Sequence, residues 1–218
     1  MAAILKPFIS VMEIGMTYFY NLTGNYGWAI VMLTIVVRVV ILPLTLYQQR
    51  SMRKVQALQP KVKELQAKYK SEPERLNKEL MELYRNEKAN PVMGCLPLLI
   101  QLPFLWGLFD TLKNYAYQGT PTFFWISDLH ANTKVADPYY ILVILTALAT
   151  LWSTYTSGVS ADPTQKTMMY VMPLLFAYFT LNFPAGVALY WVVSTLIQVA
   201  QNYVYPGIRV PKGETAAR

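Results

Sequence analysis

A single charged residue, Arg38, lies in the middle of an apolar segment that runs from residue 28 to residue 47. A helix of about twenty residues rises about 30 Å, which is close to the thickness of the hydrocarbon layer of a membrane. Trp28 and Tyr47 bracket the segment, as aromatic residues do at the two membrane interfaces. A guanidinium at mid-depth costs roughly 2.5–3.5 kcal/mol and keeps its proton, so we expect Arg38 to face water or a polar group inside the membrane.

The sequence supplies no obvious anionic partner for Arg38, because the neighbouring apolar segments contain no Asp or Glu within them. Two interpretations follow. In the first, the long side chain of Arg38 extends to a membrane interface. In the second, Arg38 lies in a wet, positively charged cavity. Thr34 and Thr45 favour the second interpretation, because their offsets of 4 and 7 from Arg38 place all three residues on one face of a continuous helix.

The composition places the chain among polytopic α-helical membrane proteins. Hydrophobic residues make up 54% of the 218 residues and charged residues only 14%, whereas a soluble domain carries about a quarter charged residues. The segments 138–161 and 167–208 contain no charged residue, and both are long enough to span a membrane. We predict five spans, at about 28–47, 92–109, 139–156, 167–181 and 187–204. The short turn at 182–186 predicts that the last two are antiparallel neighbours.

Loop charges predict the orientation. The segment 48–89 carries eleven basic and six acidic residues, which places it in the cytoplasm, with the N-terminus outside and the C-terminus inside. Helical spacing is shown by Ile4, Phe8, Val11 or Met12, Gly15 and Phe19, and this series predicts an amphipathic helix. The predicted organisation is therefore an interfacial amphipathic helix (1–22), a first transmembrane helix (23–49), a cytoplasmic helical hairpin (50–89), transmembrane helices 2–5 (90–205) with an external loop (118–136), and a cytoplasmic tail (206–218).

The hairpin prediction rests on apolar spacing. Val55, Leu58, Val62, Leu65 and Tyr69 recur at intervals of 3, 4, 3 and 4, and a second series follows at Leu76, Leu80 and Leu83. Two interpretations stay open for its surface. It is either a solvated helical pair with a structural role, or a basic surface that contacts anionic lipid or ribosomal RNA.

Several kinds of chemistry are disfavoured by the residues present. Cys95 has no second cysteine to pair with, and we expect a packed, inert thiol. The single histidine, His130, makes a metal site or a histidine-based triad improbable. Ser153 and Ser194 lie in predicted spans without a base. No Walker-type segment is present. We therefore expect neither an enzyme nor a cofactor. Gln101 and Gln198 are interpreted as interhelical hydrogen-bonding residues.

Several linked motifs resemble those of the YidC/Oxa family of membrane insertases, over roughly residues 17–205. They are Trp28…Thr34…Arg38…Leu42-Pro43-Leu44, Leu58-Gln59-Pro60, Lys68-Tyr69, Gly94-Cys95…Pro97…Gln101…Pro103, Met172-Pro173, and Phe183-Pro184-Ala185-Gly186…Leu189-Tyr190-Trp191. The resemblance implies a five-helix core around a hydrophilic groove that is open to the cytoplasm and to lipid. It also implies a mobile cytoplasmic hairpin needed for activity. We therefore expect a short member of the family, without the large periplasmic domain that precedes the first core helix in Gram-negative members, and a removed signal segment stays open.

Within this resemblance, Arg38 is the groove arginine, and Thr34 and Trp191 lie on the substrate path. Our candidate groove residues are Thr34, Arg38, Thr45, Gln101, Ser153 and Trp191, and our candidate hairpin residues are Leu58, Pro60 and Tyr69. The implied partners are nascent membrane proteins with short acidic or polar tails, a Sec translocon, membrane lipids and, weakly because the tail is short, the ribosome. A monomer in a bacterial inner membrane is expected.

Two other functions stay open at this point. One is a small-anion transporter or channel with Arg38 as the anion site, although five spans do not divide into two inverted halves. The other is an assembly subunit of a translocon that holds helices without inserting them.

Overall fold

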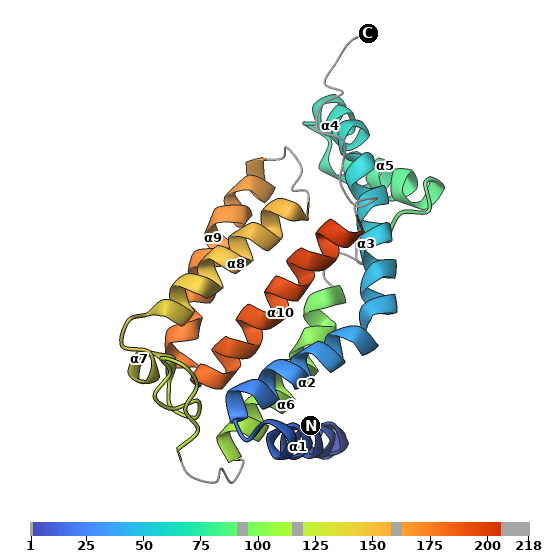
Figure 1. The fold of residues 1–218 in the computed structure, drawn as a ribbon. Helices are drawn as coiled ribbons and strands as arrows, with labels where there is room; N and C mark the ends of the chain where they lie inside the picture. Colours follow the sequence, from blue (N-terminus) through green and yellow to red (C-terminus); the bar gives the residue numbers. More distant parts are fainter. Residues whose placement is uncertain (1, 91–95, 115–119, 158–162, 206–218) are drawn as a thin grey trace.

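The computed structural model describes residues 2–90, 96–114, 120–157 and 163–205, and in these ranges the chain folds into ten α-helices (Figure 1). This confirms the predicted all-α class. The helices are α1 (Ala2–Thr23), α2 (Tyr26–Val40), α3 (Leu42–Ala57), α4 (Gln59–Lys68), α5 (Pro73–Asn86), α6 (Leu96–Asn114), α7 (Thr133–Ala136), α8 (Ile141–Thr156), α9 (Pro163–Asn182) and α10 (Ala185–Val204). Cys95 and the predicted 206–218 tail lie outside the described residues.

The predicted first span is bent. We expected one helix over 28–47, but α2 ends at Val40 and α3 begins at Leu42, with a bend of 60° between them. Pro43 causes the break, because proline donates no backbone N–H and its ring crowds the preceding turn, so it fits in the first turn of a new helix. Of the helices described, none alone is long and apolar enough to cross a membrane, and α2 with α3 passes that test as a bent pair.

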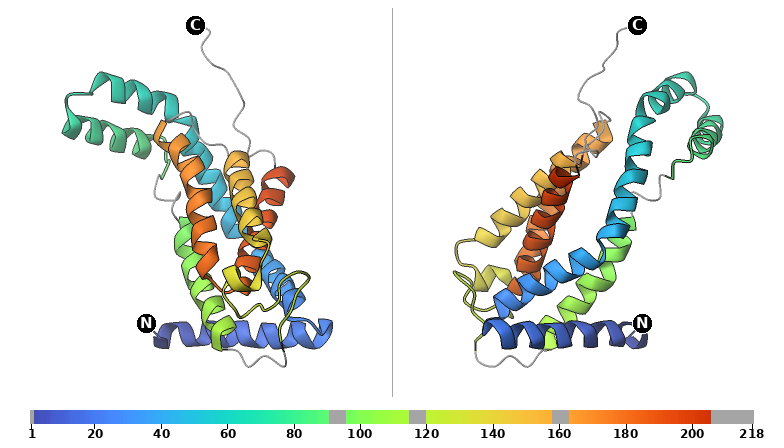
Figure 2. Two further views of the ribbon diagram at one scale, coloured as in Figure 1. Left: turned by 90° about the vertical axis from the view of Figure 1, so that its left-hand side faces the viewer. Right: turned by 45° about the vertical axis from the view of Figure 1, so that its right-hand side comes forward.

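The helix α10 lies at the centre of the bundle. It packs against α2, α6, α7 and α8, while α1 packs against α2 and α6 (Figures 1 and 2). We predicted that the last two helices are antiparallel neighbours, and α9 and α10 do run in opposite directions (Figure 1). The main packing partners of α9 are nevertheless α8 and α7. The turn between α9 and α10 is held by α7, because the Thr133 N–H donates to the Phe183 carbonyl at 2.9 Å.

The connection between α6 and α8 is held against the bundle by backbone and side-chain contacts. The Ala185 N–H donates to the Ala131 carbonyl and the Gly186 N–H donates to the Leu129 carbonyl, both at 2.9 Å. Asn25 caps α2 through its side-chain oxygen, and its amide nitrogen donates to the Thr122 carbonyl at 3.1 Å. This connection therefore closes the end of the bundle at which α2 and α10 begin.

Gly27 permits the closest of these contacts. A Cβ atom at position 27 would lie 2.0 Å from the Phe123 ring, a distance that real structures do not show. We expect Gly27→Ala to displace Phe123 and to destabilise the protein by about 1–3 kcal/mol, the usual cost of overpacking. Thermal unfolding in detergent measures this. Gly27→Ala combined with Phe123→Gly, which also removes the Phe123 Cβ at 2.6 Å, should lose less than the two single changes together, and additive losses would contradict the proposed clash.

The first helix presents two different apolar faces. Met12 and Met16 are buried in the main core, so Met12 (4% exposed) and not Val11 (61% exposed) faces the bundle. A second, exposed stripe consists of Val11, Ile14, Tyr18 and Leu22. Figure 2 shows α1 lying across one end of the bundle. An exposed apolar stripe on such a helix favours the predicted position at a membrane interface.

The outward faces of α2, α8 and α9 are also apolar. Exposed large side chains on them include Val36, Val39, Val40, Ile144, Leu148, Trp152, Val171, Leu174 and Phe179. An exposed apolar surface of this extent is unfavourable in water and suits contact with lipid.

Candidate functional site

Arg38 joins α2 to α10. Its Nε donates a hydrogen bond of 2.7 Å to the Ser194 hydroxyl. The bend at Ile41 places Arg38 in the last turn of α2, where a cation interacts favourably with the partial negative charge of the helix end. The structure has ion pairs at Lys61–Glu87 and Arg75–Glu72 in the α4–α5 region, and neither involves Arg38. Among the described residues no carboxylate pairs with Arg38, and its hydrogen bond to Ser194 directs the guanidinium toward α10.

Gln101 and Tyr190 form a second link, between α6 and α10. The Gln101 amide nitrogen donates to the Tyr190 hydroxyl. Tyr190 is buried and precedes Ser194 by four residues, so both side chains lie on the same face of α10. The predicted groove residues Arg38 and Gln101 are thus brought to one face of α10 by two residues, Tyr190 and Ser194, that we had not selected.

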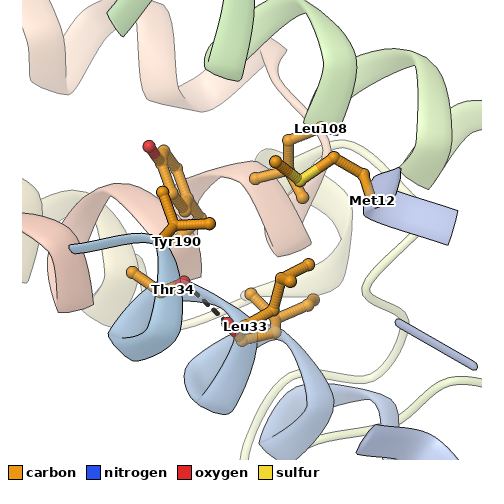
Figure 3. Close-up of a pocket in the computed structure, with 7 residues that line it drawn as sticks. Met12, Leu33, Thr34, Leu108 and Tyr190 are labelled. Atoms are coloured by element: carbon orange, nitrogen blue, oxygen red, sulfur yellow. Dashed lines mark hydrogen bonds between the residues drawn. The ribbon is translucent and has the colours of Figure 1, made fainter. Parts of the chain in front are cut away.

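Thr34 lies in a closely packed region and not on an open polar face. Its hydroxyl donates to the Ile30 carbonyl at 2.6 Å, and its side chain is buried. A small cavity beside it has room for about one water molecule, at about 10 Å³. The cavity is lined by Met12, Ile30, Leu33, Thr34, Val37, Leu108 and Tyr190 (Figure 3). The mostly apolar lining indicates that the predicted polar face does not extend past Thr34.

The remaining predicted groove residues are not brought to Arg38 by any hydrogen bond in the structure. The Thr45 hydroxyl bonds to the Leu42 carbonyl of its own helix at 2.9 Å. The Ser153 side chain is buried on α8. The Trp191 ring packs against Phe176 at 4.5 Å between ring centres, and its Nε1 has no partner among the described residues. One residue corresponds to a rotation of about 100° around a helix, so Trp191 lies on a different face of α10 from Tyr190.

A third link, which sequence reasoning missed, joins α3 to α10 nearer the α4–α5 hairpin. The Gln49 amide nitrogen donates to the Asn202 side-chain oxygen at 3.3 Å, and the Asn202 amide nitrogen donates to the Thr156 hydroxyl at 3.0 Å. We call the three pairs Gln101–Tyr190, Arg38–Ser194 and Gln49–Asn202 the polar ladder. The spacing of Tyr190, Ser194 and Asn202, at offsets of 4 and 8, could have indicated this polar face.

The polar ladder has the chemistry of a binding surface. It contains amides, hydroxyls and one guanidinium. No group of three or more His, Cys, Asp or Glu side chains gathers anywhere in the described ranges. The ladder can therefore donate and accept hydrogen bonds and attract anions.

The Gln101–Tyr190 link yields a stability prediction. We expect Tyr190→Phe to leave the Gln101 amide without its partner and to reduce the free energy of unfolding by about 1–3 kcal/mol. Adding Gln101→Leu removes the unpaired amide and should recover part of that loss, while Ser194, the other hydrogen-bond partner of Tyr190, keeps its bond from Arg38. Chemical unfolding of the four variants in a double-mutant cycle measures the coupling. A double variant as unstable as the sum of the two singles would contradict the link.

The hairpin residues fall into two groups. Leu58 is buried with Val55 and Ala89 in a small core that Leu83 and Tyr84 complete. Tyr69 is buried between the cations of Lys68 and Arg75, which lie 5.1 and 5.0 Å from its ring centre.

Pro60 has the simplest role of the predicted hairpin residues. It is exposed in the first turn of α4, where a missing N–H is harmless.

Between α4 and α5, the Glu72 carboxylate accepts a hydrogen bond from Arg75 and raises the pKa of that guanidinium, so this cation stays charged.

The sequence pattern of the family described as "60Kd inner membrane protein" matches residues 18–210. Among curated proteins, "Membrane protein insertase YidC" of Wolinella succinogenes is 39% identical over 216 residues, covering 98% of this chain and 39% of that protein. The protein of the same description from Geobacter sulfurreducens is 37% identical over 203 residues, covering 93% of this chain and 37% of that protein. The Helicobacter pylori protein is 40% identical over 189 residues, covering 86% and 34%.

A solved structure is also similar. The one described as "Active YidC insertase crystal structure with the first transmembrane domain resolved" matches with a TM-score of 0.72 and 30% sequence identity, over 92% of this chain and 46% of that chain. The present chain thus spans between 34% and 39% of the length of these curated relatives.

Proposed function

Because this chain belongs to the 60Kd inner membrane protein family, the YidC/Oxa family, we propose that it is a membrane protein insertase. It receives newly made membrane proteins from the cytoplasm, holds their polar tails at the polar ladder and releases their apolar helices sideways into the bilayer.

The proposal rests on the contacts of the Arg38 guanidinium. Its guanidinium is tied to Ser194 by one of five N–H groups, and none of the described carboxylates pairs with it. A carboxylate on a substrate tail is the complementary ligand. Two opposite charges attract by about 1 kcal/mol at 4 Å in water and by about 4 kcal/mol in a protein-like environment. Arg38 therefore binds acidic tails weakly enough to release them.

We propose that the apolar helix of the substrate contacts the exposed apolar surface of α8 and α9. The exposed apolar side chains of α8 and α9 lie outside the polar ladder. A substrate helix that leaves along such a surface gains about 25 cal/mol for each Å² of apolar surface removed from water. We propose that this burial, and not the hydrolysis of a nucleotide, drives the step.

The same proposal includes the cellular location, the membrane orientation and the partners of the protein. The protein lies in the inner membrane of a bacterium, with the α4–α5 hairpin and the C-terminus in the cytoplasm and α1 at the outer interface. The net charge of the 48–89 segment supports this orientation, since eleven basic residues face six acidic ones. Its partners are nascent membrane proteins and lipids, together with a Sec translocon and weakly the ribosome, and it acts as a monomer.

The experiment that tests the proposal uses liposomes that contain only the purified protein. A single-span substrate with a short acidic tail is added, and the fraction of tail protected from external protease is measured. Protected, correctly oriented substrate above the level of empty liposomes is the expected result. No gain over empty liposomes, with the helical fold confirmed by circular dichroism, would contradict autonomous insertion and favour an assembly subunit that needs a translocon.

A further inference from the structure

Side-chain amides gather at the end of the polar ladder that is nearest the α4–α5 hairpin. Gln49 of α3 and Asn202 of α10 are in contact through a hydrogen bond of 3.3 Å, and Gln48 and Gln201 are their neighbours in the sequence; we call these four residues the amide cluster. The main packing partners of α3 are α2, α4 and α6, and α10 packs mainly on other helices. The two helices are joined here by the side-chain hydrogen bond from Gln49 to Asn202. The junction is therefore made of uncharged hydrogen bonds and not of a packed apolar interface.

Three polar atoms of this cluster are buried without a hydrogen-bond partner among the described residues. They are the amide nitrogen of Gln48 and the side-chain oxygens of Gln49 and Gln201. Gln48 as a whole is only 2% exposed. A buried polar group without a partner has lost its hydrogen bonds to water, so such groups indicate a missing partner that supplies both donors and acceptors.

An extended polypeptide has the required chemistry. Its main chain presents one N–H donor and one C=O acceptor per residue, with a rise of about 3.3 Å per residue. The amide cluster carries no charge, so it cannot select for acidic or basic side chains. Arg38, eleven residues before Gln49, attracts carboxylates. The two parts of the ladder therefore differ in what they recognise: Arg38 selects side-chain charge, and the amide cluster accepts any sequence.

We infer that the amide cluster of Gln48, Gln49, Gln201 and Asn202 binds the main chain of an extended substrate tail. This inference rests on the proposed insertase function and adds to it a sequence-independent site. Gln201 is the best residue for testing it. It follows Ser194 by seven residues and so lies on the ladder face of α10, and its oxygen is free of any partner in the described part of the chain.

The test compares two synthetic single-span substrates that differ only in the tail. One tail contains alanines, and the other contains N-methylalanine at alternate positions, which removes main-chain N–H donors without changing charge. We expect the unaltered protein to insert the N-methylated substrate about threefold to tenfold more slowly, the effect of one or two hydrogen bonds. Gln201→Met keeps the size of the side chain and removes the acceptor, and should reduce this difference toward one.

Two further variants control for structure. Gln198→Met changes the same helix one turn earlier and should keep the full difference between the substrates. Gln201→Glu retains acceptor oxygens and should also keep it, which separates loss of an acceptor from disturbed folding. If the unaltered protein inserts both substrates equally, or if Gln201→Met keeps the full difference, the amides bind only water and the inference is wrong. If it inserts neither substrate above empty liposomes, the proposed insertase function itself fails.

Discussion

Replacing Arg38 with glutamate is expected to reduce insertion of a substrate with an acidic tail by more than tenfold. At about 8 Å in a wet protein interior, two unit charges interact by about 2 kcal/mol, so reversing the sign changes the interaction by about 4 kcal/mol before screening. The Ser194 hydroxyl can donate to the new carboxylate, so the link between α2 and α10 is retained in the variant. Loss of insertion would then reflect charge and not loss of the fold.

Arg38→Lys is the matched variant. Lysine keeps the positive charge but not the planar guanidinium, so we expect most of the activity toward acidic tails to remain. The measurement is the initial rate of tail protection in proteoliposomes, for tails that are identical except for acidic or neutral residues. Arg38→Glu should affect the neutral tail far less than the acidic tail. Equal losses of the insertion rate in the lysine and glutamate variants would show that substrate binding depends on the shape of the guanidinium and not on its charge. Unchanged rates in both variants would show that Arg38 does not bind the substrate.

Deleting residues 52–86 and joining the ends by a short Gly/Ser linker is expected to abolish insertion and leave the rest of the protein folded. The small core around Leu58 is separate from the main core of α1, α2, α6, α8 and α10. The helices α4 and α5 pack mainly on each other and on the end of α3, away from the rest of the bundle (Figure 2). Thermal unfolding should therefore change little, while protected substrate falls to the level of empty liposomes.

Point variants test whether insertion requires the folded structure of the hairpin or only the presence of a chain of this length. Leu58→Asp places a charge in the small core, where Leu58 is 6% exposed, and should unfold the hairpin. Met81→Ala alters a side chain on α5 that is 73% exposed and should have no effect. Normal insertion by the deletion variant would show that the hairpin has only a structural role.

The positions of several helices can be predicted from the spacing of apolar residues along the sequence. The apolar spacing places α8 at 141–156 and α10 at 185–204, close to the predicted 139–156 and 187–204. The 3-and-4 spacing predicts one helix from Val55 to Tyr69, but the structure divides it at Leu58 between α3 and α4, where Pro60 fits the first turn of a new helix. The second series lies on α5 as predicted. Such patterns are readable because helical periodicity depends on residues only three or four positions apart. The bend at Ile41 was missed, although Pro43 carried the local signal.

The partners of the polar side chains required the folded structure. Arg38 binds Ser194 across 156 residues of sequence, and Gln49 binds Asn202 across 153. Thr34 lies on the predicted helix face, yet it lines a small, mostly apolar cavity and not a polar one. Which residues of two helices meet depends on the rotation and axial position of each helix, and these are decided by the packing of the whole bundle.

The sequence by itself determined that this chain is helical and apolar, that its central arginine lacks a nearby carboxylate, and that a basic hairpin follows. Each of these properties is local in the chain. The tertiary structure alone decided that α10 is the helix on which Arg38, Gln101 and Gln49 converge, through Ser194, Tyr190 and Asn202. Hydrogen bonds between helices act over about 3 Å, so they exist only where packing brings distant segments into contact.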